Sequence, residues 1–304
     1  MSDLTETSGD RVPAEGAPAA SAREPSGQQE HRHGALSYAA EWARQLTRRR
    51  TQWIFGILVV LPVIFIAAFA LDDGPSRGEQ GTRFVDIATS GGPNFSVFVL
   101  LVSGELLLYI VAALLVGDPV PAEASWSSLR YLLTAPVRRA RLLTSKLLVG
   151  LSALAVATIL LPLWSLLLGG FVYGMSDYQI PGGGELDSAT FWSRIAIAIG
   201  YVFVATLPIA GIAFLVGVRT DTPLAAVGAA LMVYIVAGIL DSIDALGDWR
   251  KALPGHYGRE WLELLTTTDP DWTGMQRGLL WSLLYFTIFV VLGYRVFRRK
   301  DILS

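Results

Sequence analysis

Apolar residues are concentrated in six runs of the chain, each about as long as a membrane-spanning helix. A bilayer core roughly 30 Å thick requires about 20 mostly apolar residues in one helix. The six runs are Trp53–Leu71, Phe95–Val116, Leu147–Phe171, Ile195–Val216, Ala225–Leu240 and Gly278–Phe297. This pattern predicts an all-α membrane protein with six transmembrane helices.

The basic residues between these runs predict how the chain is oriented. Lys and Arg near span ends are enriched on the cytoplasmic side of a membrane, whereas acidic residues have little influence. If the six runs span the membrane, the following basic residues lie on one and the same side: Arg44, Arg48, Arg49, Arg50, Arg130, Arg138, Arg139, Arg141, Lys146, Arg219, Arg295, Arg298, Arg299 and Lys300. The basic residues of the other side are diluted by acids. We therefore expect a multi-pass protein of the cell membrane with both termini in the cytoplasm.

Composition agrees with a membrane protein and excludes some chemistry. Hydrophobic residues make up 52% of the 304 and charged residues only 16%, which is far from the balance of a soluble domain. There are no cysteines, so disulfides, thiolate metal sites and cysteine nucleophiles are excluded. Neither the net charge of -2 nor any motif favours a nucleic-acid partner.

The chain divides into a polar tail and a membrane domain. Residues 1–34 are rich in Ser, Gly, Pro, Ala and Glu, and we expect them to be a disordered cytoplasmic tail. Residues 35–304 are the predicted six-span domain. Within it, the apolar positions of 35–52 recur at helical spacing and predict a helix lying on the inner leaflet, although its arginines could serve only to orient the first span. Residues 241–277 are predicted as an external loop with short helices.

Residues 118–146, between the second and third spans, are too polar and basic to cross the membrane. Pro121 suits the first turn of a helix, and Trp126, Leu129, Leu132 and Leu133 follow at spacings of three and four. Pro136 ends this pattern because proline removes a backbone donor. The sequence therefore predicts a short amphipathic cytoplasmic helix, followed by a turn that offers arginines to acidic groups.

The same segment resembles the signature of the type 2, exporter-type family of ATP-binding cassette (ABC) transporter permeases. The matching residues are Glu123, Ser127-Ser128-Leu129, Leu132-Leu133, Pro136-Val137, Arg139, Leu142-Leu143 and Lys146, and Phe297-Arg-Arg-Lys-Asp301-Ile302 resembles the close of these chains. Ser127 departs from the pattern, since the family often has glycine there. The resemblance covers roughly residues 35–304 and implies an export permease subunit, a transport protein with no enzymatic activity of its own.

The resemblance also implies partners and a mechanism. The chain has no Walker-type loop for nucleotide phosphates, so ATP and Mg²⁺ would be bound by a separate ATPase subunit and no cofactor by this chain. The predicted coupling helix would lie in a groove of that ATPase, with Trp126 and Leu129 as anchors and Glu123 and Arg130 setting the register. Leu133 and Arg138 complete the expected docking surface. A second copy, or a similar permease, would supply the other half of the transport path among membrane lipids.

Glu105 is the one acidic residue expected near the middle of a span. Such groups usually face a bundle interior or an aqueous cavity, because an ionisable side chain is costly in hydrocarbon. One interpretation is contact with the substrate along the transport path. The other is a structural bond to a Ser, Tyr or backbone group of a neighbouring span.

Two other classes of membrane protein remain as alternatives. A lipid-modifying enzyme would need convergent catalytic groups, but His31 and His33 lie in the tail and His256 stands alone in the sequence. An ion-coupled secondary transporter would be expected to show internal repeats and more intramembrane charge. The substrate is not identified by the sequence, although an amphiphilic, drug-like or lipid-like molecule suits an apolar path.

Overall fold

The computed structural model describes residues 38–71, 85–125 and 139–299. Contacts divide the chain into two units, Met1–Ala35 and Leu36–Ser304. The first unit lies outside the described residues, and so does the tail predicted for 1–34. The description below concerns the second unit.

Five helices of this unit are long and apolar enough to cross a membrane. They are α2 (Arg49–Ala70), α8 (Arg139–Tyr173), α9 (Ser188–Arg219), α10 (Pro223–Asp241) and α12 (Thr273–Arg299). Two shorter helices, α4 (Gly92–Gly104) and α5 (Leu107–Gly117), pass the same test as a pair but are bent by 61° where they meet. The prediction of an all-α multi-pass membrane protein is confirmed in this form. The number of spans is five, or six if the bent pair is one span.

Shorter elements join these helices. Helix α1 (Tyr38–Thr47) precedes α2, and α6 (Pro119–Ser125) follows α5. Between α10 and α12 lie the 3-10 helices η1 (Asp244–Ala252) and η2 (Glu260–Leu262) and the single turn α11 (Glu263–Thr266). The short helices expected in 241–277 are therefore present. Their position outside the membrane stays a prediction.

A small β-hairpin connects α8 to α9. Strands β1 (Tyr178–Gln179) and β2 (Glu185–Leu186) pair antiparallel, and Gly182, Gly183 and Gly184 between them have φ angles of 118°, 114° and 99°. Such angles favour glycine because it has no Cβ. Asn94 of α4 ties the hairpin down: its Nδ2 donates to the Gln179 carbonyl at 2.8 Å, and its Oδ1 accepts from the Gln179 amide at 3.0 Å.

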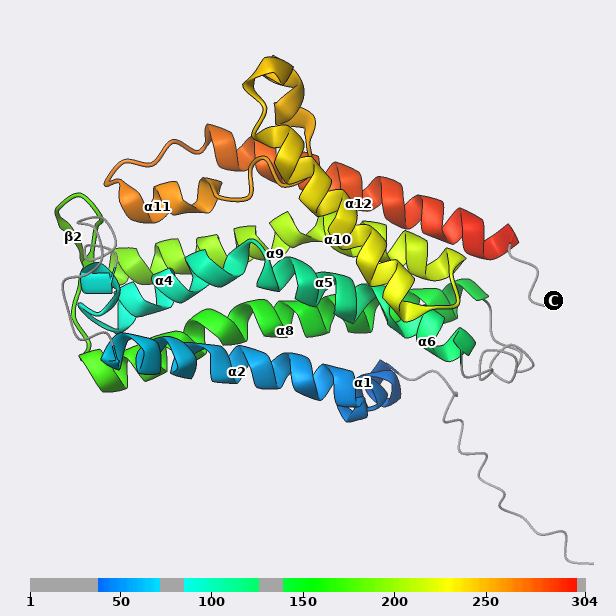
Figure 1. The fold of residues 1–304 in the computed structure, drawn as a ribbon, viewed down its shortest axis with the longest axis horizontal. Helices are drawn as coiled ribbons and strands as arrows, with labels where there is room; N and C mark the ends of the chain where they lie inside the picture. Colours follow the sequence, from blue (N-terminus) through cyan, green and yellow to red (C-terminus); the bar gives the residue numbers. More distant parts are fainter. Residues whose placement is uncertain (1–37, 72–84, 126–138, 300–304) are drawn as a thin grey trace, which may run out of the picture. The chain divides into compact units, whose positions relative to one another are not determined.

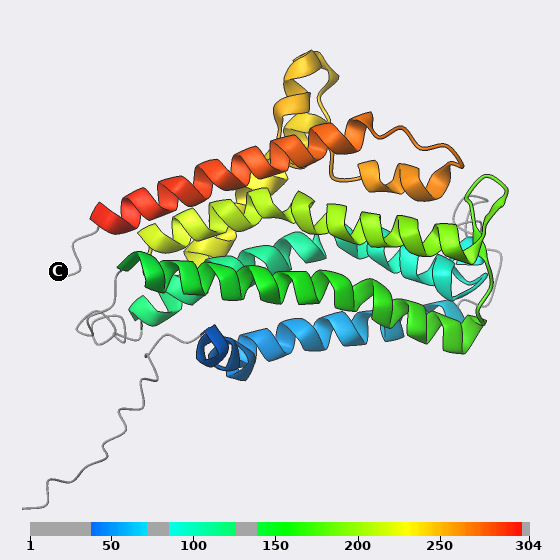
Figure 2. The ribbon, with the colours of Figure 1, turned by 180° about the vertical axis from the view of Figure 1, so that it is seen from behind.

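Two long helices, α8 and α9, organise the bundle. Helix α9 packs against α12, α5 and α10, whereas α8 packs against α4, α5 and α2. Figures 1 and 2 view the bundle from opposite sides, and both show α8 and α9 running along its whole length. At one end lie α1, α6 and the last turn of α12, here called the α6 end (Figure 1). At the other lie the β-hairpin and the first turn of α4, here called the hairpin end.

The outer faces of the bundle are apolar. Leu224 and Met232 of α10 are 83% and 61% exposed, and Leu280 of α12 is 70% exposed. A soluble protein rarely exposes continuous apolar surface of this kind, whereas hydrocarbon tails accommodate it. Inside the bundle, side chains such as Phe95, Leu154 and Phe214 are fully buried. The exposed apolar faces therefore independently support a membrane location.

Candidate functional site

The predicted docking surface falls mostly outside the described residues. Glu123 belongs to α6, whose backbone is described but whose side chain at this position is not. Trp126, Leu129, Arg130, Leu133 and Arg138 lie in 126–138, which is not described. The amphipathic coupling helix therefore stays a prediction. The described helix α6 begins at Pro119 and includes Pro121 in its first turn, as the sequence pattern requires of the start of such a helix.

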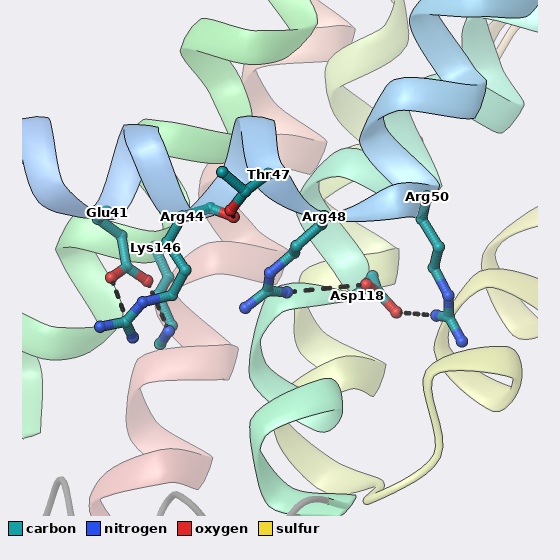
Figure 3. A network of polar contacts seen from close by, with 7 residues as sticks. All are labelled: Glu41, Arg44, Thr47, Arg48, Arg50, Asp118 and Lys146. Atoms are coloured by element: carbon teal, nitrogen blue, oxygen red, sulfur yellow. Dashed lines mark hydrogen bonds and ion pairs between the residues drawn. The ribbon is translucent and has the colours of Figure 1, made fainter.

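Both ends of the 118–146 segment are held by charged residues from the start of the described chain (Figure 3). At the first end, Asp118 is the C-cap residue of α5 and is 6% exposed. Arg50, in the first turn of α2, donates a hydrogen bond to Asp118 Oδ1. Arg48 Nη1 lies 3.9 Å from the other carboxylate oxygen. Two arginines at the α1–α2 junction thus bind the point where the second span ends.

At the second end, Lys146 of α8 pairs with Glu41 of α1. Its Nζ donates to Glu41 Oε1 at 2.8 Å, and the two side chains are only 3% and 6% exposed. Arg44 Nη1 lies 3.5 Å from the second oxygen of Glu41. A buried charge is tolerated only when it is paired and hydrogen-bonded. The pair therefore fixes α1 against the first turns of α8.

The two carboxylates of this network differ in pKa. Burial alone would raise the pKa of Glu41, but the Lys146 ammonium and its hydrogen bond, with Arg44 and Arg48, hold that pKa below its ordinary value. Burial raises the pKa of Asp118 above its ordinary value, although Arg50 and Arg48 oppose the shift. The pKa of Asp118 therefore lies above 3.8 and the pKa of Glu41 below 4.5.

Helix α1 presents its polar side to the bundle and its apolar side outward. Glu41 and Gln45 are buried, whereas Ala39, Ala43 and Leu46 are exposed. A soluble amphipathic helix buries the opposite face. An outward apolar stripe is also found on helices that lie at a bilayer surface, but the interfacial position predicted for 35–52 stays a prediction.

Glu105 lies at the bend between α4 and α5, where it is the C-cap residue of α4. Both of its carboxylate oxygens accept hydrogen bonds from the guanidinium of Arg259, which lies between η1 and η2. The sequence analysis had considered Ser, Tyr and backbone partners from neighbouring spans. The structure instead brings in an arginine from the segment predicted to be external.

The segment 253–259 is bound to the bundle beside this ion pair. Tyr201 of α9 donates to the Tyr257 carbonyl at 2.5 Å, and His256 Nδ1 lies 2.5 Å from Asp241 Oδ1 at the end of α10. A cavity lined in part by Tyr109 and Tyr257 has a volume of only about 10 Å³. That is about the space of one water molecule. Neither Glu105 nor Arg259 lines this cavity, so whether their ion pair is structural or contacts a substrate stays a prediction.

A family model described as "Protein of unknown function (DUF2705)" matches residues 60–303. The chain belongs to the DUF2705 family. No curated protein matches the chain.

The DUF2705 match covers most of the site residues described above. Glu105, Asp118, Lys146 and Arg259 lie within residues 60–303, whereas α1 and the start of α2 precede that range. The family description assigns no activity. A function therefore has to be inferred from the geometry of the α6 end.

Lys146 and Glu105 could be singled out from the sequence, but their partners were not. Glu41 was noted only as part of a polar face, and neither Asp118 nor Arg259 was proposed for a site. The sequence does contain a feature that could have predicted Glu41 and Asp118 as ion-pair partners. Glu41, Asp118 and Glu123 are the only acids within 35–52 and 117–146, where many arginines occur. Isolated acids in a strongly basic surrounding are natural ion-pair partners.

Proposed function

We propose that the chain is the membrane-spanning permease subunit of an ABC transporter and carries out ATP-driven export together with a separate ATPase subunit. The observation that carries the proposal is the anchoring of both ends of residues 118–146. Asp118 and Lys146 bracket the segment that resembles the ATPase-docking signature, and each binds charges of α1 or α2. A force applied to this segment would reach two spans and the α1–α2 junction together.

The mechanism follows from that anchoring. Closure of the ATPase pair would push the docked helix, with Trp126 and Leu129 as anchors, and the ends of α5 and α8 would move with it. The buried pair Lys146–Glu41 would transmit the movement to α1, because breaking it would leave an uncompensated charge. ATP and Mg²⁺ would act in the partner subunit. A second copy of the chain, or a similar permease, would complete the path in the cell membrane, with both termini in the cytoplasm.

The test is physical association with an ATPase and coupling of its activity. The full chain is co-expressed with any nucleotide-binding protein that an adjacent reading frame encodes, purified in mild detergent and returned to nanodiscs, and ATP hydrolysis is measured. We expect the two proteins to co-purify. Leu129→Asp should remove the association or the coupled hydrolysis while the chain remains in the membrane fraction, because a carboxylate would be buried in an apolar groove.

Trp249→Asp is the matched control. Trp249 is 81% exposed on η1, so the change adds the same charge to an exposed apolar position outside 118–146. It should leave both association and hydrolysis unchanged. If no ATPase co-purifies with the wild-type chain, or if Leu129→Asp behaves like the control, the proposal is wrong.

A further inference from the structure

A cavity of about 340 Å³ opens at the hairpin end of the bundle, between α4, the end of α8, the β-hairpin and the start of α9. Small-molecule pockets in proteins typically measure about 300–1,000 Å³. The floor is apolar: Pro93, Leu166, Tyr178 and Phe191 line it, and all four are buried. The cavity is therefore large enough for a small ligand and has apolar side chains at its floor.

Aromatic rings form one side of the cavity. Tyr178 and Phe191 are stacked with ring centroids 5.4 Å apart, and the Trp192 ring stands edge-on to Phe191 at 5.9 Å. Trp192 is 46% exposed, so its ring is available at the mouth. Aromatic faces attract cations through their quadrupole, and tryptophan does so most strongly.

Asp177 provides the charge at the mouth. Its Oδ1 accepts a hydrogen bond from Ser188 Oγ at 3.0 Å, which holds the carboxylate at the rim. Within the described part of the chain Asp177 makes no ion pair. The rim thus combines a positioned carboxylate, which no described basic residue neutralises, with an exposed indole ring.

The surrounding segment also favours a cation. Residues 174–193 contain three acids, Asp177, Glu185 and Asp187, and no Lys, Arg or His. Arg194 follows directly, but its guanidinium donates to the carbonyls of Leu264, Thr267 and Thr268. An anionic ligand would meet only repulsion from these side chains. A neutral ligand could donate a hydrogen bond to the carboxylate at the rim but would lack the charge attraction that a cation gains there. The combination of apolar floor, aromatic side and acidic rim fits an organic cation with an apolar body.

We propose that this cavity, here called the cation pocket, binds a small organic ammonium compound with an aromatic or short aliphatic body. The body would contact Phe191 and Leu166 on the floor. The ammonium would lie between the Asp177 carboxylate and the Trp192 ring. This binding site does not depend on whether the chain is an ABC permease, because it requires no partner subunit.

The absence of native cysteines allows a direct test on the full chain in nanodiscs. Met175 lines the cavity and is 66% exposed, so Met175→Cys places the only thiol at the mouth. The rate of its modification by an uncharged maleimide is measured with increasing benzyltrimethylammonium. Benzyl alcohol and benzoate serve as the neutral and anionic probes of similar size. Trp249→Cys, on η1, reports any effect of the cation that is unrelated to the cavity.

We expect benzyltrimethylammonium to slow modification of the thiol at position 175 and to leave the thiol at position 249 unaffected. Adding Asp177→Asn should raise the half-protecting concentration about fivefold, the contribution of one exposed charge contact. Glu185→Gln, a hairpin acid that does not line the cavity, should leave that concentration unchanged. Three results would overturn the proposal. They are equal protection by all three probes, no protection by any of them, and a half-protecting concentration that Asp177→Asn leaves unchanged.

The lipid composition identifies the source of the cation. In nanodiscs made only of phosphatidylglycerol, the soluble cation should protect the thiol in full. If phosphatidylethanolamine or phosphatidylcholine alone slows modification, and Asp177→Asn relieves the effect, the pocket takes the ammonium of a lipid headgroup. If these lipids have no effect, the ligand is a soluble cation. Both outcomes support an ammonium site, provided that Asp177 is required.

Discussion

Replacing Lys146 by methionine should strongly destabilise the bundle, because it removes one partner of a buried ion pair. The side chains of Lys146 and Glu41 are 3% and 6% exposed and 2.8 Å apart, so water cannot replace the lost ammonium. Breaking a buried pair by removing one partner costs about 3–5 kcal/mol. Arg44, 3.5 Å from Glu41, still compensates part of the remaining charge, so we take the lower limit, about 3 kcal/mol.

This free energy translates into a measurable change in thermal stability. A loss of 1 kcal/mol lowers Tm by about 2–4 °C in proteins of 150–250 residues, so Lys146→Met should lower it by about 6–12 °C. The assay is the unfolding transition followed by intrinsic tryptophan fluorescence in detergent, at neutral pH and a fixed scan rate. The fixed rate matters because membrane proteins commonly unfold irreversibly, which makes the apparent Tm depend on the scan.

A double-mutant cycle distinguishes the ion pair from general damage to the site. Glu41→Gln alone should also lower Tm, since it leaves the buried ammonium without its carboxylate. The double variant should be more stable than the sum of the two single effects implies, because it leaves neither charge unpaired. Asp244→Asn, which removes an exposed pair with Arg250, is the control and should change Tm little. Additive effects, or a Lys146→Met variant as stable as wild type, would refute the reasoning.

Three further predictions concern other parts of the molecule. Gly92→Ala should lower Tm by several degrees because its Cβ would lie 2.7–2.9 Å from the backbone of α8, whereas Gly228→Ala, with open space around the new Cβ, should leave Tm unchanged or slightly raised. Glu105→Gln should speed amide hydrogen exchange in residues 253–260 several-fold and leave the β-hairpin unaffected, because the exposed ion pair holds only that segment. Infrared titration of the carboxylates should show that Asp118 protonates above its ordinary value of 3.8 and Glu41 below 4.5, each assigned by loss of the band in the Asn or Gln variant.

The signs of the two pKa shifts determine how stability changes with pH. The pKa of Glu41 is lowered by folding, so its contribution is present above the ordinary value and is lost as pH falls through the folded-state pKa. The pKa of Asp118 is raised, so folding favours its protonated form below the ordinary value, and that contribution disappears as pH rises through the folded-state pKa. The contribution of Glu41 is therefore lost below pH 4.5, whereas that of Asp118 changes above pH 3.8.

The helices could be predicted from the sequence because each apolar run has the length that a bilayer imposes. The run predicted as Trp53–Leu71 is α2 (Arg49–Ala70), and the run Gly278–Phe297 lies within α12 (Thr273–Arg299). The extra turns at helix ends are polar, so hydropathy alone does not include them. The pattern also does not tell which apolar face contacts other helices, because lipid and protein interior both accept Leu, Val and Phe.

The bend at Glu105 and the ion pairs at the α6 end could not be predicted in the same way. An apolar run that contains one acid reads as a single span, whereas the structure bends it by 61° beside the contact with Arg259. That contact joins positions 154 residues apart in the chain. Similarly, Glu41 and Lys146 are separated by 105 residues. Local periodicity carries no information on such distant partners, since they are selected by the tertiary packing.

The two groups of ion pairs are connected through one short helix. Helix α5 (Leu107–Gly117) is about 16 Å long at 1.5 Å per residue, with Glu105 just before it and Asp118 directly after it. One end is tied through Glu105 to Arg259 and the segment 253–259, and the other through Asp118 to Arg48 and Arg50. Because the bend separates α5 from α4, α5 can change its tilt without moving α4 by the same amount. A displacement of the α1–α2 junction therefore acts on a helix whose far end is tied through Glu105 to Arg259.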